Sequence, residues 1–223
     1  MKRRVIPIPI PTPLLKICGL LYPEQAAVIA SLGVDALGVI GVPSSPRFLP
    51  AELRPNLFSA MKTSQPSCRG VLVVADPLDQ DIKELDVNRG HQVVQLHGEE
   101  TPQRCGELRE RLRVDLWKAI RIKHPNDLER ALAYEPVVDA LLLDAWVPDQ
   151  LGGTGHAIPI NWLTKFNPAR PWWLAGGITA TRLPQLLDVL HPDGIDCSSG
   201  VEILPGVKDI DEVKKIIHFI KRL

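Results

Sequence analysis

The sequence predicts a single-domain α/β protein built as a (β/α)8 TIM barrel, in which eight parallel strands are surrounded by helices. Across 223 residues, short apolar runs alternate with helical patterns eight times. Runs that are apolar throughout and are followed by a crossover helix are typical of parallel strands buried on both faces. A hydrophobic fraction of 45% is enough for one sizeable core. A doubly wound open sheet is the alternative, but it needs neither an eighth unit nor a final helix that returns to the start.

The barrel is expected over residues 14–223, after a proline-rich N-terminal extension over residues 1–13. The basic start of this extension resembles a secretory leader, but its alternating prolines forbid the apolar helix that a leader needs. We therefore expect a flexible extended arm and a cytoplasmic protein.

The strands are predicted from their Val, Ile and Leu content. In chain order they cover 14–18 (LLKIC), 35–40 (DALGVI), 69–75 (RGVLVVA), 92–97 (QVVQLH), 116–120 (LWKAI), 139–143 (DALLL), 172–175 (WWLA) and 194–198 (GIDCS). Three of them begin with similar Val-Asp-Ala or Asp-Gly-Ile phrases, which we interpret as repeated helix-to-strand turns at the bottom of the barrel.

A helical pattern follows each strand, and the first shows the signals used. Pro23 favours a helix start, and Gly33 is a typical C-terminal stop. In chain order the helices are expected at 23–32, 51–61, 77–87, 102–113, 125–133, 161–166, 179–190 and 209–223.

Charge and cysteine content exclude several function classes. Lys plus Arg equals Asp plus Glu at 26 each, so no basic field favours nucleic acid or an anionic membrane. No apolar run approaches the roughly 18 residues of a spanning helix. The cysteines at 18, 68, 105 and 197 form no CxxC pair, which predicts reduced thiols and no metal site.

Two apolar runs end in residues suited to proton transfer, Cys18 and Asp144. Side-chain alternation places Lys16 and Cys18 on one face of the first strand, and Leu142 and Asp144 on the matching face of the sixth. Taken singly, Cys18 is more often a small buried hydrophobe and Asp144 a capping residue. Barrel active sites gather at the C-terminal strand ends, so the two together predict a base and an acid at one mouth.

Glycine-rich segments follow the last three strands. Gly176-Gly177 and Ser199-Gly200 come after strands seven and eight, where barrels bind phosphate through backbone N–H groups. Tight turns are the alternative explanation of each. The segment Gly152–Gly155 after strand six is long enough for a mobile flap over a substrate.

Two further polar residues are candidates for the same predicted mouth, and an ion pair is predicted below it. Arg47 follows strand two and could pair bidentately with a carboxylate, although a solvated arginine is the alternative. His97 ends strand four and either lines the mouth or is a structural histidine. Buried Lys16 needs a counter-charge, and Asp196, inward on adjacent strand eight, is predicted to supply it within about 4 Å, another acid being the alternative.

An ordered set of motifs from residue 14 to the end resembles the phosphoribosylanthranilate isomerase family of tryptophan biosynthesis. The motifs are KICG (16–19), SPR (45–47), VQLHG (94–98), LDA (143–145), GGTG (152–155), LAGG (174–177), DCSSGVE (196–202) and PGVKD (205–209). The chain departs from the family pattern at three places. Leu20-Leu21 stands where the family often has Thr soon after the first motif, and the third strand and the loop after the second strand also differ from the family's usual sequence.

The resemblance implies an Amadori rearrangement of a phosphorylated aminoaldose, without cofactor. It implies that Asp144 acts as general acid on the ribose ring oxygen and Cys18 as general base at C2′. Arg47 then binds the anthranilate carboxylate, and the remaining substrate-binding residues are His97, Gly153, Gly176, Gly177, Asp196, Ser199 and Gly200. A thiol with an ordinary pKa of about 8.5 needs local positive potential to ionise at neutral pH, and helix N-termini at the barrel mouth are expected to supply it. The chain is expected to act as a monomer or a homodimer.

Two other functions are weighed against this one. An indole-glycerol-phosphate synthase-like lyase shares the phosphate loops, but should place Lys and Glu around the reacting carbon, where this chain has Cys18. A non-catalytic barrel that binds a phosphorylated ligand needs neither proton-transfer residue.

Overall fold

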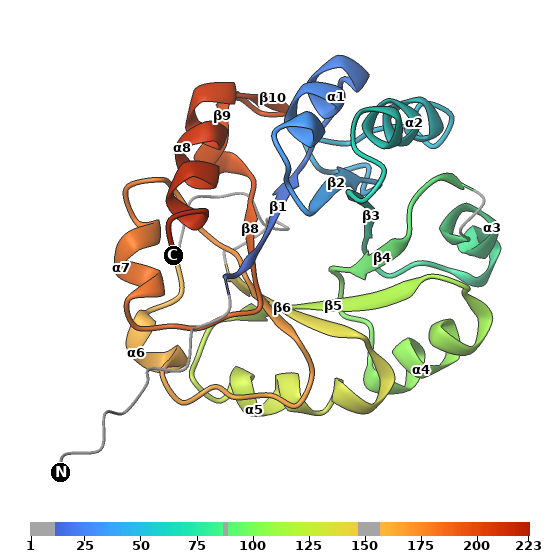
Figure 1. Ribbon diagram of the computed structural model, residues 1–223. Helices are drawn as coiled ribbons and strands as arrows, with labels where there is room; N and C mark the ends of the chain where they lie inside the picture. The colour runs from blue at the N-terminus through green and yellow to red at the C-terminus, as the bar shows by residue number, and fades with distance from the viewer. Residues whose placement is uncertain (1–11, 87–88, 147–156) are drawn as a thin grey trace, which may run out of the picture.

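The computed structural model describes residues 12–86, 89–146 and 157–223 and shows one closed barrel of eight parallel strands (Figure 1). The strands are β1 (Leu14–Cys18), β2 (Ala36–Ile40), β3 (Arg69–Val74), β4 (Val93–Leu96), β5 (Asp115–Ile122), β6 (Ala140–Ala145), β7 (Trp172–Leu174) and β8 (Gly194–Cys197). They pair in chain order, and β8 closes the ring on β1. The predicted barrel is thus confirmed, and the open-sheet alternative is wrong.

Helices surround the barrel, as the ribbon shows (Figure 1). They are α1 (Pro23–Ser31), α2 (Arg54–Ser64), α3 (Ile82–Leu85), α4 (Pro102–Arg111), α5 (Asp127–Leu132), α6 (Ile160–Leu163), α7 (Leu183–Leu187) and α8 (Ile210–Ile220). Short 3₁₀ turns lie at η1 (Asp79–Asp81), η3 (Glu135–Val137) and η4 (Ser199–Val201). Among the described residues, no helix has the length and apolar character needed to cross a membrane.

Strand alternation divides the buried side chains into two sets. Val71 and Val73 of β3 point inward, whereas Leu72 packs against the helices. Inside the barrel, the Trp117 and Trp173 rings lie 4.8 Å apart and fill its floor. Cys18 and Ala140 belong to the inner set, as expected, and Lys16 is fully buried. Leu14, predicted on the same face, is 47% exposed where β1 begins.

The repeated turns at the bottom of the barrel are built by aspartates. Asp35 accepts a hydrogen bond from Leu15 N (2.8 Å), and Asp139 accepts one from Leu116 N (2.9 Å). Asp193 does the same for Trp172 N (2.9 Å). In each case, the carboxylate accepts a hydrogen bond from the backbone N–H of the first or second residue of the preceding strand. The similar phrases in the sequence therefore encode one local structure used three times.

Some helix boundaries differ from the prediction. The helix expected at 77–87 is a 3₁₀ turn followed by the single turn α3, because Asp81 caps Leu78 N and diverts the start. The helix expected at 179–190 begins only at Leu183, after a turn closed on Thr179, and α2 runs about three residues later than expected. The sequence pattern also missed a small hairpin between β8 and α8, formed by β9 (Glu202–Leu204) and β10 (Val207–Lys208).

Candidate active site

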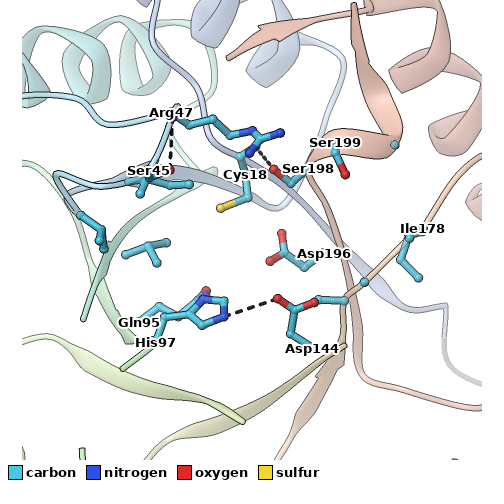
Figure 2. A pocket seen from close by; sticks show the side chains of 17 residues that line it. Cys18, Ser45, Arg47, Gln95, His97, Asp144, Ile178, Asp196, Ser198 and Ser199 are labelled. Carbon is cyan, nitrogen blue, oxygen red and sulfur yellow. Dashed lines mark hydrogen bonds and ion pairs between the residues drawn. The ribbon is translucent and has the colours of Figure 1, made fainter. Parts of the chain in front are cut away.

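A pocket opens at the C-terminal ends of the strands and gathers most of the predicted site residues (Figure 2). It is lined by Cys18, Arg47, His97, Asp144, Gly176, Gly177, Asp196, Ser199 and Gly200, among others. These residues come from β1, β6 and β8 and from the segments that follow β2, β4, β7 and β8. Gly153 and the predicted flap at 152–155 lie outside the described residues.

Cys18 ends β1, and the neighbouring strand leaves space for its thiol. A Cβ built on Gly38, its register partner on β2, would lie only 2.6 Å from Cys18 Sγ. Ser198 Oγ donates a hydrogen bond to the Cys18 carbonyl (3.1 Å), which ties the end of β1 to the loop after β8. In Figure 2 the sulfur projects into the space between Arg47 and the acids below.

The predicted ion pair beneath the thiol is confirmed. Lys16 Nζ lies 2.8 Å from Asp196 Oδ2, and the two residues are register partners on β1 and β8. Burial alone lowers the pKa of Lys16, but the charges of Asp196 and Cys18 outweigh it and raise that pKa. The other oxygen of Asp196 is buried, and no described residue donates a hydrogen bond to it.

Burial raises the pKa of the Cys18 thiol, while the nearby ammonium groups of Lys16 and Lys208 oppose that rise. These two lysines supply positive potential that the sequence-based argument attributes to helix N-termini. Burial also raises the pKa of Cys68 and of Cys105, each to about 12, although one lysine opposes the rise in each case, Lys62 and Lys118 respectively. All four cysteines are free and buried, but only Cys18 lines the pocket.

Asp144 ends β6 on the far side of the pocket from Cys18 (Figure 2). Its Oδ1 accepts a hydrogen bond from Ala145 N (2.9 Å), which fixes the carboxyl group. Its Oδ2 lies 3.4 Å from His97 Nε2, a buried nitrogen that forms no hydrogen bond with any described residue. His97 Nδ1 is in turn 3.3 Å from Gln95 Nε2.

The two glycine-rich loops meet beside the pocket. Gly176 and Gly177 adopt φ values of 86° and 59°, which favour glycine strongly. A Cβ on Gly200 would lie 1.9 Å from the Ile178 carbonyl oxygen, so the loops after β7 and β8 pack backbone to backbone. Among the described residues, none accepts a hydrogen bond from the N–H groups of Gly177, Ser199 or Gly200. The loops thus present free donors suited to an anion.

Arg47 is buried rather than solvated, which excludes the alternative weighed from the sequence. Its guanidinium forms a fork with Glu202, a residue of the hairpin that the sequence pattern missed. Lys208 Nζ lies 2.6 Å from the same carboxylate. Glu202 and Lys208 stand in motifs noted in the sequence, but nothing in the sequence showed that the segment folds back over the pocket.

The described residues contain no cluster of three His, Cys, Asp or Glu side chains that could hold a metal ion.

Comparison with known proteins gives a consistent picture. The model of the family "N-(5'phosphoribosyl)anthranilate (PRA) isomerase" matches residues 15–219. The N-(5'-phosphoribosyl)anthranilate isomerase of Trichormus variabilis is 44% identical over 89% of this chain and 94% of its own length. The crystal structure of phosphoribosyl anthranilate isomerase from Thermotoga maritima superposes with a TM-score of 0.84 at 30% identity, covering 95% of this chain and all of that one. A second similar structure (TM-score 0.78, 29% identity, covering 95% of this chain and 100% of that one) is a phosphoribosyl anthranilate isomerase in complex with reduced 1-(o-carboxyphenylamino)-1-deoxyribulose 5-phosphate.

Proposed function

The chain belongs to the N-(5'-phosphoribosyl)anthranilate isomerase family of tryptophan biosynthesis, and we propose that it carries out its isomerisation with Cys18 as the general base and Asp144 as the general acid. The enzyme converts the aminoaldose N-(5'-phosphoribosyl)anthranilate into 1-(2-carboxyphenylamino)-1-deoxyribulose 5-phosphate. The lyase and the non-catalytic barrel weighed from the sequence are therefore set aside.

In the first step, the Asp144 carboxylic acid protonates the ribose ring oxygen. The C1′–O bond breaks, and the nitrogen lone pair forms the C=N bond of an iminium ion at C1′. The short Asp144–Ala145 contact supports this role because it holds one carboxyl oxygen and leaves the other facing the pocket and His97. His97 is well placed to contact the substrate or the acid at this stage.

In the second step, the Cys18 thiolate removes the proton from C2′, and the electron pair moves toward the iminium nitrogen to give an enolamine. Tautomerisation then places a proton on C1′ and the ketone at C2′. Lys16 and Lys208 stabilise the thiolate form against burial. This step removes a proton on the face of the sugar opposite the acid, which fits two groups on different walls of one pocket.

Substrate binding is assigned to three parts of the mouth. The N–H groups of Gly176, Gly177, Ser199 and Gly200 bind the phosphate, and Arg47 binds the anthranilate carboxylate. Asp196, which also lines the pocket, faces the sugar. Gly153, in the segment outside the described residues, is proposed to contact the substrate from above. No cofactor is needed for two proton transfers.

The cellular setting and assembly are also proposals. Four free cysteines suit a reducing cytoplasm. The chain is proposed to act as a monomer or a homodimer; one similar structure is that of monomers generated from the dimeric enzyme of Thermotoga maritima.

The observation that carries the proposal is that a thiol and a carboxyl group face each other across one pocket beside two glycine loops (Figure 2). The test follows the loss of anthranilate fluorescence when purified protein is mixed with N-(5'-phosphoribosyl)anthranilate. Cys18→Ala and Asp144→Asn are each expected to lower kcat by about 100-fold or more, while the variants still bind the reduced product analogue.

Matched controls separate chemistry from folding. Cys105→Ala removes a buried thiol in α4, and Asp139→Asn removes a carboxylate just before β6, at the other end of that strand from Asp144. Both controls should keep wild-type kcat. A Cys18→Ala or Asp144→Asn enzyme with unchanged kcat would overturn the assignment of that residue.

A further inference from the structure

The Arg47 side chain is held on one edge by a buried carboxylate. Its Nε–H donates to both oxygens of Glu202, at 2.9 and 3.1 Å, and its Nη2 donates at 2.6 Å. Both side chains are more than nine-tenths buried. This side-on fork uses a rigid pair of donors, so it fixes the plane of the guanidinium as well as its position.

The fork leaves a second edge of the guanidinium free. The Nη1 group carries two N–H donors, and Nη2 keeps one that the fork does not use. Among the described residues, none accepts a hydrogen bond from Nη1 of Arg47. Arg47 lines the pocket together with Ser45 and Cys18, as Figure 2 shows, so this second edge is available to a ligand carboxylate there.

Glu202 is itself fixed by the hairpin that carries it. Lys208 Nζ donates to its Oε1 at 2.6 Å, and Gly206 N donates to the same oxygen at 3.0 Å. Lys208 also reaches the Ser198 carbonyl oxygen at 3.4 Å, which ties the hairpin to the loop after β8. Burial would raise the pKa of Glu202, but the hydrogen bonds from Arg47 and the charge of Lys208 lower it, so the carboxylate stays ionised.

The stem of Arg47 is confined as well. A Cβ built on Gly19, which has a φ of 82°, would lie 2.5 Å from Arg47 Cδ. Arg47 N donates to Ser45 Oγ at 3.2 Å. The backbone just after β1 and the loop after β2 therefore confine the stem of the Arg47 side chain, and Glu202 fixes the position of its guanidinium.

We propose that Glu202, fixed by Lys208, is a positioning residue that presents the free edge of the Arg47 guanidinium to the carboxylate of the anthranilate ring. This inference rests on the proposed role of Arg47 in substrate binding. Without Glu202, the long arginine side chain regains rotamer freedom and gives up its preorganised geometry, so carboxylate binding weakens while phosphate binding remains.

The test uses two probes that differ in one group. The first is reduced 1-(o-carboxyphenylamino)-1-deoxyribulose 5-phosphate, and the second is the same compound made from aniline, without the carboxylate. Calorimetry gives Kd for both. The Kd of the second probe divided by the Kd of the first reports carboxylate recognition alone. Glu202→Gln should reduce this ratio by about tenfold, since a hydrogen-bonded charge contact is disturbed, and leave the affinity for the second probe within about twofold of wild type.

Two further variants keep the result interpretable. Glu202→Asp keeps a negative charge between Arg47 and Lys208, and is therefore expected to fold. Its carboxylate lies one methylene farther from Arg47 and cannot form the same pair of hydrogen bonds, so this variant should also lose the discrimination between the two probes. The affinity for the aniline-derived probe shows on each variant that the pocket is folded. Glu100→Gln alters the buried Glu100–Lys118 pair outside the pocket, and should leave the ratio unchanged.

The outcomes distinguish the inference from the proposed function. If Arg47→Met abolishes the discrimination while both Glu202 variants keep it, the positioning role is wrong and the role of Arg47 stands. If the Glu202 variants weaken both probes equally, Glu202 is merely structural and the inference is overturned. If Arg47→Met itself keeps the discrimination, both the role of Arg47 and the inference are wrong.

Discussion

Replacing Lys16 with Met removes one half of a buried ion pair. Lys16 is fully buried, and its 2.8 Å contact with Asp196 crosses from β1 to β8 at the closure of the barrel. In Lys16→Met, the Asp196 carboxylate is left with no cation in contact, and its second oxygen already lacks a donor among the described residues. Breaking a buried pair on one side costs about 3–5 kcal/mol, far more than an exposed pair.

For a chain of this length, each kcal/mol shifts the melting temperature by about 2–4 °C, so Lys16→Met should melt about 6–20 °C below wild type. Urea unfolding measures the free energy directly. The double variant Lys16→Met/Asp196→Asn removes both charges, and should be more stable than Lys16→Met alone. A loss below about 1 kcal/mol for Lys16→Met, or strictly additive losses in the double variant, would refute the reasoning.

The same ion pair makes the stability of the protein depend on pH. The folded-state pKa of Lys16 is raised above its ordinary value of 10.5. Its contribution is therefore fully present below that value and is lost as the pH rises through the raised pKa. The stability difference between wild type and Lys16→Met should stay constant from pH 7 to 10 and narrow only at more alkaline pH.

Three further predictions concern the pocket. Gly38→Ala places a Cβ 2.6 Å from the Cys18 sulfur; steady-state kinetics should show kcat reduced by about tenfold or more, and an unchanged kcat would contradict the placement of the thiol. Gly200→Ala places a Cβ 1.9 Å from the Ile178 carbonyl oxygen and separates the two glycine loops; KM should rise and inhibition by inorganic phosphate should weaken, whereas an unaltered inhibition constant would remove these loops as the phosphate site. Because Lys208 opposes the upward shift of the Cys18 pKa, Lys208→Met should move the acid limb of the pH profile of kcat/KM to higher pH. The control is Lys118→Met, which alters a buried ion pair elsewhere. An acid limb at the same pH in both variants would contradict the argument.

The barrel was predictable because its signals are local and repeat. Each strand is a short apolar run whose alternation already assigns Cys18 and Asp144 to the inner face, and the structure keeps that alternation. The Asp turns at the bottom of the barrel appear as repeated phrases for the same reason. Helix ends were less predictable, because a single cap such as Asp81 decides where a turn begins.

The site was predictable only where one strand end determines it. The Lys16–Asp196 pair follows from the adjacency of strands one and eight in a closed barrel, since both side chains point inward. The Arg47–Glu202–Lys208 cluster does not follow from any local pattern. It depends on the hairpin of β9 and β10 after β8, so residues 155 apart in sequence meet through tertiary structure alone. The contribution of Lys208 to the positive potential at Cys18 does not follow from the sequence for the same reason.

The most direct test of the account is a primary isotope effect at the atom that Cys18 is proposed to deprotonate. Substrate carrying deuterium at C2′ is compared with unlabelled substrate in single-turnover measurements on wild type and Cys18→Ser, with Asp144→Asn alongside. The account predicts that the weaker base makes proton removal fully rate-limiting, so Cys18→Ser turns over far more slowly than wild type and with the larger isotope effect. In Asp144→Asn, where ring opening becomes slow, the effect should be suppressed. A Cys18→Ser enzyme that reacts at the wild-type rate without an isotope effect would contradict the assignment of Cys18 as the base.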